Sequence, residues 1–160
     1  MTLEDLGSLN GVYVRVLSSA ELSHGAEIRI GQELLRYEQV AEAAPVVVSP
    51  DDTAVQGSVD EAGWGRLLRV VGPGLSSHAW VLTGAKVVLG RDVGDITFRD
   101  DGFVSGRHAQ VAQREGKVYL SDLGSSNGTY LRLRGSCRLG PGELVLVGQQ
   151  VVRLSVPDRV

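Results

Sequence analysis

This chain of 160 residues is poor in cysteine, in aromatic residues and in excess charge of either sign. Its single cysteine, Cys137, cannot form an internal disulfide, and no His/Cys cluster with metal-ligand spacing occurs. No apolar run reaches about 18 residues, and no basic n-region follows Met1, so neither a membrane span nor a signal peptide is predicted. A net charge of -3 disfavours a general nucleic-acid binder. We therefore expect a cytoplasmic protein with no metal, cofactor, membrane or nucleic-acid partner.

Glycine, in contrast, is abundant. The 21 glycines, about twice the ordinary frequency, divide the chain into short segments rich in Val and Leu. Such segments, separated by turn residues, are typical of strands. The strands predicted after residue 65 are 66–71, 79–82, 86–89, 96–98, 109–113, 118–121, 143–147 and 150–154. The best helix candidate, 30–40, is short and contains Gly31, so we interpret it as a strand. The fold class is all-β, in a sandwich arrangement.

An internal repeat becomes visible when the sequence is shifted by 117 positions. Residues 5–36 then align without a gap with residues 122–153, with 14 identities in 32 positions. The pair begins with DLGSLNGVYVRV and DLGSSNGTYLRL. The chain therefore carries about one and a half copies of one unit.

The repeat suggests three parts: a partial copy at 1–40, a linker at 41–65 and a complete domain at 66–158. The linker prediction rests on a segment with five acidic residues, no basic residue and much Ala, Pro, Ser and Gly. A half-copy of about 40 residues lacks a sufficient core of its own. Either it is a truncated first domain, or its strands complete themselves against the second domain or a partner subunit. We expect 66–160 to fold alone and the half-copy to be protease-sensitive or to drive homodimer formation.

Four short signatures occur in order in the second copy: Gly90-Arg91, Asp95-Ile96, the segment 105–108 (SGRH) and the segment 124–129 (GSSNGT). Their order and spacing resemble those of the forkhead-associated (FHA) domain. The resemblance covers roughly 66–156. It implies a sandwich of about eleven strands, of the SMAD/FHA type, whose loops at one end bind phosphothreonine peptides.

The residue types agree with that chemistry. A phosphothreonine carries about -1.5 to -2 charges and three acceptor oxygens, so its receptor needs a cation, hydroxyls and backbone N–H groups. Arg91 follows a strand end and supplies the guanidinium, and Ser105 and Ser126 supply hydroxyls. Each of the three also has an ordinary interpretation as a surface or turn residue.

Three further residues complete the predicted phosphopeptide site. Gly106 allows backbone N–H groups to approach the ligand, although many similar domains carry Lys or Arg at this position. Arg107 either compensates for that difference or faces away from the site. Asn127 begins an Asn-Gly turn, and the resemblance implies that its amide also bonds the peptide backbone.

The resemblance gives Gly90, His108 and Gly128 structural roles, with His108 bonding between loops. No Ser/His/Asp arrangement with credible spacing surrounds His108, so no catalytic residue is predicted and the chain is not expected to be an enzyme. Charges from 86 to 108 cancel, so recognition would depend on individually placed donors.

The sequence thus predicts a phosphothreonine-binding module in signalling by Ser/Thr kinases. Its partner would be a phosphorylated kinase or kinase substrate. Thr53, in the linker, is a candidate phosphorylation site that could dock into the same site. The alternative is a structural or oligomerising domain that binds a partner without phosphate. The N-terminal copy has Leu9 and Val12 where the second has Ser126 and Thr129, so it cannot build the phosphate site.

Overall fold

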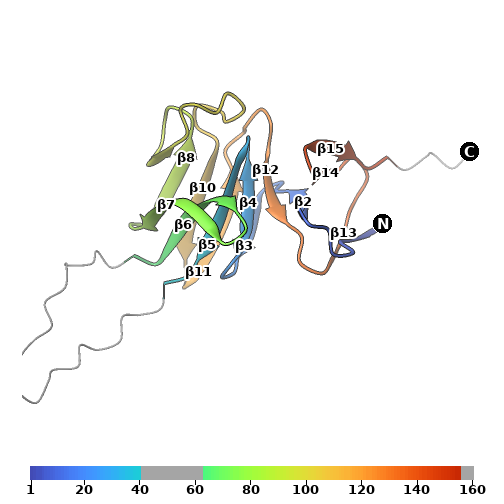
Figure 1. Cartoon of the computed structure of the whole chain (residues 1–160), viewed down its shortest axis with the longest axis horizontal. Coiled ribbons are helices and arrows are strands. Elements are labelled where there is room, and N and C mark those ends of the chain that lie inside the picture. The colour runs from blue at the N-terminus through green and yellow to red at the C-terminus, as the bar shows by residue number, and fades with distance from the viewer. Residues whose placement is uncertain (41–62, 156–160) are drawn as a thin grey trace, which may run out of the picture.

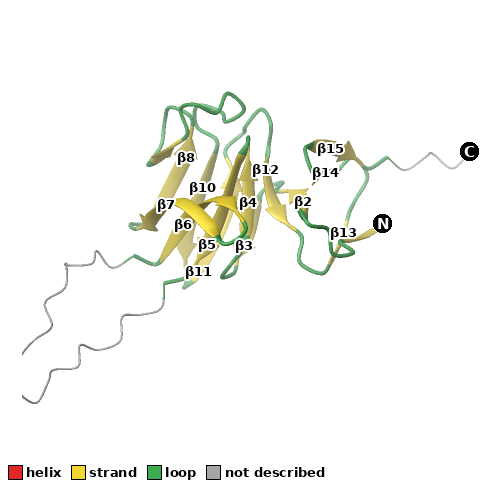
Figure 2. Ribbon diagram, viewed as in Figure 1, coloured by secondary structure: helices red, strands yellow, loops and turns green. Residues whose placement is uncertain are grey.

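The structure, a computed structural model, describes residues 1–40 and 63–155, and all regular structure in these ranges is β-strand (Figure 2). The predicted all-β fold class is confirmed. The described residues contain no helix that is long and apolar enough to cross a membrane. Most of the predicted linker 41–65, the candidate phosphorylation site Thr53 and the last residues of the predicted domain 66–158 lie outside the described residues.

Two main sheets and one small sheet hold all the strands. The eight-stranded sheet has the order β15-β14-β2-β12-β4-β5-β6-β7. In that order its strands are Gln150–Arg153, Leu144–Val147, Val12–Arg15, Thr129–Arg132, Glu27–Ile30, Glu33–Glu38, Gly65–Gly72 and Leu75–Leu82. The five-stranded sheet, β3-β11-β10-β8-β9, is formed by Ser19–Leu22, Lys117–Asp122, Ala109–Arg114, Lys86–Gly90 and Ile96–Thr97. The two-stranded sheet pairs β1 (Thr2–Glu4) with β13 (Ser136–Arg138).

All eight strands predicted after residue 65 occur, with ends displaced by a few residues at most. The segment 30–40, interpreted as a strand, contains β5. Its side chains alternate between buried and half-buried, the period-two pattern of a strand with one face on the core. Strands β12 (Thr129–Arg132) and β13 (Ser136–Arg138) were not among the predicted strands, so the local sequence pattern predicted most but not all of the strands after residue 65.

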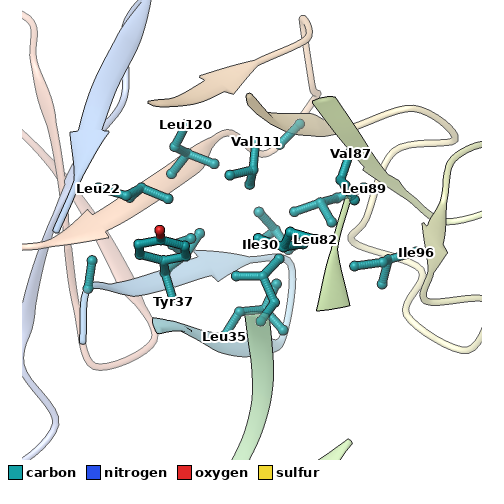
Figure 3. Packing of buried hydrophobic residues seen from close by; sticks show 14 of the residues in the cluster. Leu22, Ile30, Leu35, Tyr37, Leu82, Val87, Leu89, Ile96, Val111 and Leu120 are labelled. Atoms are coloured by element: carbon teal, nitrogen blue, oxygen red, sulfur yellow. The ribbon is translucent and has the colours of Figure 1, made fainter. Parts of the chain in front are cut away.

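The main core lies where strands of the two large sheets face each other (Figure 3). Residues distant in the sequence meet there: Ile30 and Leu35 from the N-terminal segment, Leu82 and Leu89 from the middle, and Leu120 from β11. All five side chains are fully buried. Burial of side chains this large contributes about 1.5–3 kcal/mol each, so this cluster is the main source of stability.

The N-terminal strands belong to the same sheets as the later ones. In the eight-stranded sheet β4 pairs with β12 and β5 pairs with β6, and in the five-stranded sheet β3 pairs with β11. The strands of the first 40 residues therefore pair with strands from the rest of the chain. This is one of the arrangements that the sequence left open.

Strands β13, β14 and β15 lie at the opposite end of the molecule from β6, β7 and β8, beside the N-terminus (Figure 1). A second, small cluster of buried residues lies at this end, formed by Val12, Leu139 and Val145. The molecule thus consists of a large complete sandwich and a small lobe beyond it.

Candidate functional site

Three loops meet at one end of the large sandwich because three neighbouring strands end or begin there. Leu89 near the end of β8 and Asp122 at the end of β11 both lie opposite Ala109 at the start of β10. The chain segments that follow or precede these residues must therefore emerge at the same edge of the sheet. They are residues 91–95, 98–108 and 123–128, which together contain all the predicted binding residues.

Arg91 is held by close packing of its backbone against the second loop. Its N–H donates to Ser105 O at 2.9 Å, and the N–H of Val93 donates to Gly106 O at 2.9 Å. A Cβ atom at Gly90 would collide with the carbonyl oxygens of Gly106 and Val93. This explains the Gly-Arg pair: only glycine allows the loops to come this close.

The guanidinium of Arg91 is part-exposed and lies beside an acidic neighbour. Its Nε bonds Asp92 Oδ2 at 2.9 Å. An exposed ion pair of this kind contributes about 0–1 kcal/mol, so a dianionic ligand can displace the carboxylate.

Two serines from different loops come into contact. The backbone N–H of Ser126 donates to Ser105 Oγ at 3.1 Å. Ser105 is half-buried and Ser126 is exposed. Since Ser105 O also accepts from Arg91 N, Ser105 connects the arginine loop with the Ser126 loop.

Asn127 ties the third loop to the second. Its Nδ2 donates to Phe103 O at 2.9 Å, across 24 residues of sequence. The side chain of Asn127 remains exposed at the surface. Arg107 is also exposed, so the structure places it on the second loop without assigning it to the site.

His108 lies beneath the loops and is fully buried. Its Nδ1 accepts from Ser105 N at 3.0 Å, and its Nε2 lies 2.9 Å from Gly128 O. Since Nδ1 accepts, the proton must be on Nε2, which donates to the carbonyl. Burial lowers the pKa of His108 below its usual value, although the bond to Gly128 opposes this shift. His108 is therefore a neutral residue that joins the loops through hydrogen bonds to Ser105 N and Gly128 O.

Asp122 organises the turn before Asn127, and the sequence reasoning missed it. It accepts from the N–H of Gly124 and of Ser125 at 3.0 Å, from Ser125 Oγ at 2.5 Å and from Thr129 Oγ1 at 2.6 Å. Burial raises the pKa of Asp122, but the hydrogen bonds together outweigh burial, and the pKa is lowered. An Asp three residues before a Ser at a turn was the available signal.

Asp101 links the site to the N-terminal segment. Its Oδ2 accepts from Gln32 N at 2.6 Å, and its Oδ1 accepts from Phe103 N at 2.9 Å. Gly31, at φ +53°, precedes Gln32, and a Cβ there would meet the carboxylate at 2.6 Å. The β4–β5 turn of the first copy therefore supports the loop that carries Phe103 and Ser105.

A groove of about 610 Å³ begins at Asn127. Its lining comes from three parts of the chain: Arg29, Gly31 and Gln32; Phe103, Asn127, Gly128 and Tyr130; and Leu146, Gln149 and Val151. The Nε atom of Arg29 is buried without a hydrogen-bond partner among the described residues. The groove thus offers polar and apolar surface next to the clustered loops.

Comparison with known proteins finds similarity over the part of the chain that contains the site. Residues 87–148 match the family model described as FHA domain. The FHA domain-containing protein FhaB of Mycobacterium tuberculosis is 32% identical over 92 residues, which are 56% of this chain and 59% of that protein. FhaB of Mycolicibacterium smegmatis matches to the same extent. An oxoglutarate dehydrogenase inhibitor of Corynebacterium diphtheriae is 34% identical over 90 residues, 55% of this chain and 62% of that protein.

These matches span less than two thirds of the length of each relative. No solved structure matches the chain. The family match lies between β8 and the turn after β14 and includes all three loops of the site. Residues 87–148 of this chain are therefore similar to the FHA domain family.

Proposed function

We propose that this chain is a binding module for phosphothreonine peptides in Ser/Thr kinase signalling, without catalytic activity. The observation that carries the proposal is the convergence of Arg91, Ser105 and Ser126 from three separate loops. Together they offer a guanidinium and two hydroxyls, while their own backbone N–H groups hold the loops together. This is the donor set that a phosphate dianion requires.

The hydrogen bonds between the loops support the proposal because they lower the entropy lost on binding. Ser105 N bonds His108, and Ser126 N bonds Ser105, so the loops are ordered before a ligand arrives. A preorganised site loses less entropy on binding than a flexible one. Asn127, beside the two serines, is positioned to bond the peptide backbone, and the groove that starts there would accept residues next to the phosphothreonine.

The FHA match supports a binding role, and the name of one relative, an oxoglutarate dehydrogenase inhibitor, describes a protein that acts on another protein. The expected partner is a phosphorylated protein, either a kinase or a kinase substrate.

Fluorescence polarisation with a matched pair of peptides tests the proposal. The phosphothreonine peptide should bind with a Kd on the order of micromolar, about 8 kcal/mol, and its unphosphorylated form should bind negligibly. Arg91→Ala or Ser105→Ala should weaken binding roughly 10- to 100-fold, because a hydrogen bond to a charged group contributes about 1.5–3 kcal/mol.

Arg99→Ala is the matched control, because Arg99 is an exposed arginine in the loop between β9 and β10 and is not one of the predicted donors. It should leave affinity nearly unchanged. If the two peptides bind equally, the phosphate-dependent function is wrong, and the alternative of a module that binds without phosphate gains support.

A further inference from the structure

Each strand pair that joins the two repeat copies has a counterpart in which every residue is replaced by the one at the equivalent position of the other copy, 117 residues away. The two copies are therefore related by an approximate two-fold axis. In the pairing of β2 with β12, Val14 lies opposite Leu131, which is its own repeat counterpart. The pairing of β4 with β12 has its counterpart in that of β14 with β2. The pairing of β3 with β11 likewise corresponds to that of β13 with β1.

The turns repeat as well. Gly25 N donates to Tyr37 O at 2.7 Å, and at the same positions of the second copy Gly142 N donates to Leu154 O at 2.7 Å. This agreement in backbone geometry means that both copies adopt the same local fold. The difference between the two ends of the molecule must come from what covers them.

The N-terminal repeat copy is covered by other strands of the described residues, and the C-terminal copy largely is not. Residues 65–121 form the strands β6 to β11 that close the sandwich over β3, β4 and β5. Over β13, β14 and β15, the described residues supply only β1, whose position matches the end of β11. The small cluster of Val12, Leu139 and Val145 is thus half of a sandwich core.

The uncovered face is apolar. Ile30 and Leu35 are fully buried, whereas their counterparts Val147 and Val152 are 46% and 52% exposed. In the eight-stranded sheet β5 continues to β6, but the equivalent strand β15 is the edge. An exposed edge with apolar side chains is a template for another strand.

A second copy of this chain is a poor occupant because its own first half is matched to the N-terminal copy. Arg69 makes a two-point ion pair with Glu33 at 2.6 and 2.7 Å, and Arg66 bonds Glu38 at 2.7 Å. The counterparts of Glu33 and Glu38 are the uncharged residues Gln150 and Ser155. Transfer to the second lobe would lose both ion pairs and leave the first lobe bare.

We propose that the face formed by β14 and β15 docks the first half of another FHA-type sandwich, a β-module built like residues 65–121 but without the arginine pair of those residues. The module adds a strand to the edge of β15, with the register in which β6 pairs with β5, and covers Val147 and Val152. We expect this module to have no arginines at the positions of Arg66 and Arg69. The second lobe has no acidic residue where the first copy has Glu33 and Glu38, and it carries the basic residue Arg153 nearby. Val147 and Val152 lie on one face of these strands, whereas Leu146 and Val151, which line the groove beside Asn127, lie on the other face.

The test supplies such a module covalently, so that its effective concentration is high. In the test protein, a copy of residues 63–118 with the substitutions Arg66→Ser and Arg69→Gln is placed at the N-terminus of the full chain. It replaces Met1 and is joined directly to Thr2. Hydrogen exchange at residues 147–152 and the sedimentation coefficient are then measured. We expect a monomer in which these amides exchange at least roughly 100-fold more slowly than in the original chain, since they enter a cooperative unit.

Val152→Asp in the extended chain should abolish the added protection, whereas Val71→Asp, at another exposed valine, should not. The proposal is overturned if residues 147–152 exchange at the original rate. It is also overturned if the original chain dimerises and Val152→Asp abolishes the dimer, because a second copy is then the occupant.

Discussion

Leu35 and Val152 occupy the same position in the two repeat copies, which makes them a direct test of which copy closes the main core. Leu35 is fully buried and Val152 is 52% exposed. Leu35→Ala removes apolar contacts from the centre of the core and should cost about 2–5 kcal/mol. Val152→Ala changes a half-exposed position and should stay within about 0.5 kcal/mol.

The cost for Leu35 is a large part of the total free energy of unfolding, which is typically about 5–15 kcal/mol for a protein of this kind. In urea titrations with an m-value of about 2 kcal/mol/M, the midpoint should fall by roughly 1–2.5 M for Leu35→Ala. For Val152→Ala it should fall by no more than roughly 0.25 M. Fluorescence of the tryptophans and far-UV circular dichroism should give the same midpoint if unfolding is two-state.

Equal, small shifts for both variants would refute the assignment of the N-terminal copy to the core. The double variant adds a second test. Because the two sites are independent in this structure, their effects should add within about 0.5 kcal/mol. A larger combined loss would show that the C-terminal copy replaces the N-terminal copy once Leu35 is truncated.

The remaining predictions concern charge. Burial lowers the pKa of His108, so the unfolded chain takes up a proton first as pH falls. Stability should therefore be full above about pH 6.5 and decline below it, and a urea series on the protein and on His108→Gln should show the decline only for the former. Asp92→Asn removes the carboxylate that competes for Arg91, so phosphopeptide affinity should rise up to about 5-fold; unchanged or weaker binding in fluorescence polarisation would contradict this. Glu33→Gln leaves Arg69 without its two-point partner and should cost about 1–3 kcal/mol, with the loss seen as a lower urea midpoint; no loss would mean that this ion pair does not secure the first copy.

Local sequence predicted most of the strands after residue 65, and the resemblance to FHA domains predicted the loops of the site. Alternating apolar residues predict strands irrespective of their partners, and the pattern around Gly90, Arg91 and Ser105 identifies the loops that the structure brings together. The structural role expected for His108 came from the resemblance to FHA domains, and the absence of a catalytic arrangement around it only argued against catalysis. These features depend on residues within a few positions of each other.

Contacts between distant segments could not be predicted in this way. Nothing in the sequence near Asn127 indicates that its amide bonds Phe103 O, or that Asp101 receives the backbone of Gln32 across 69 residues. Both bonds exist because the strand order brings separate loops to one edge of the sandwich.

The internal repeat shows most clearly what the sequence determines and what depends on the tertiary structure. By itself the sequence determined that residues 5–36 and 122–153 have the same local fold, because their turns and apolar positions coincide. It did not determine which copy closes over residues 65–121, since Leu35 and Val152 are equally suitable strand residues. Only the tertiary structure decided this, through larger apolar side chains and the ion pair between Glu33 and Arg69, because those energies arise only when the sheets meet.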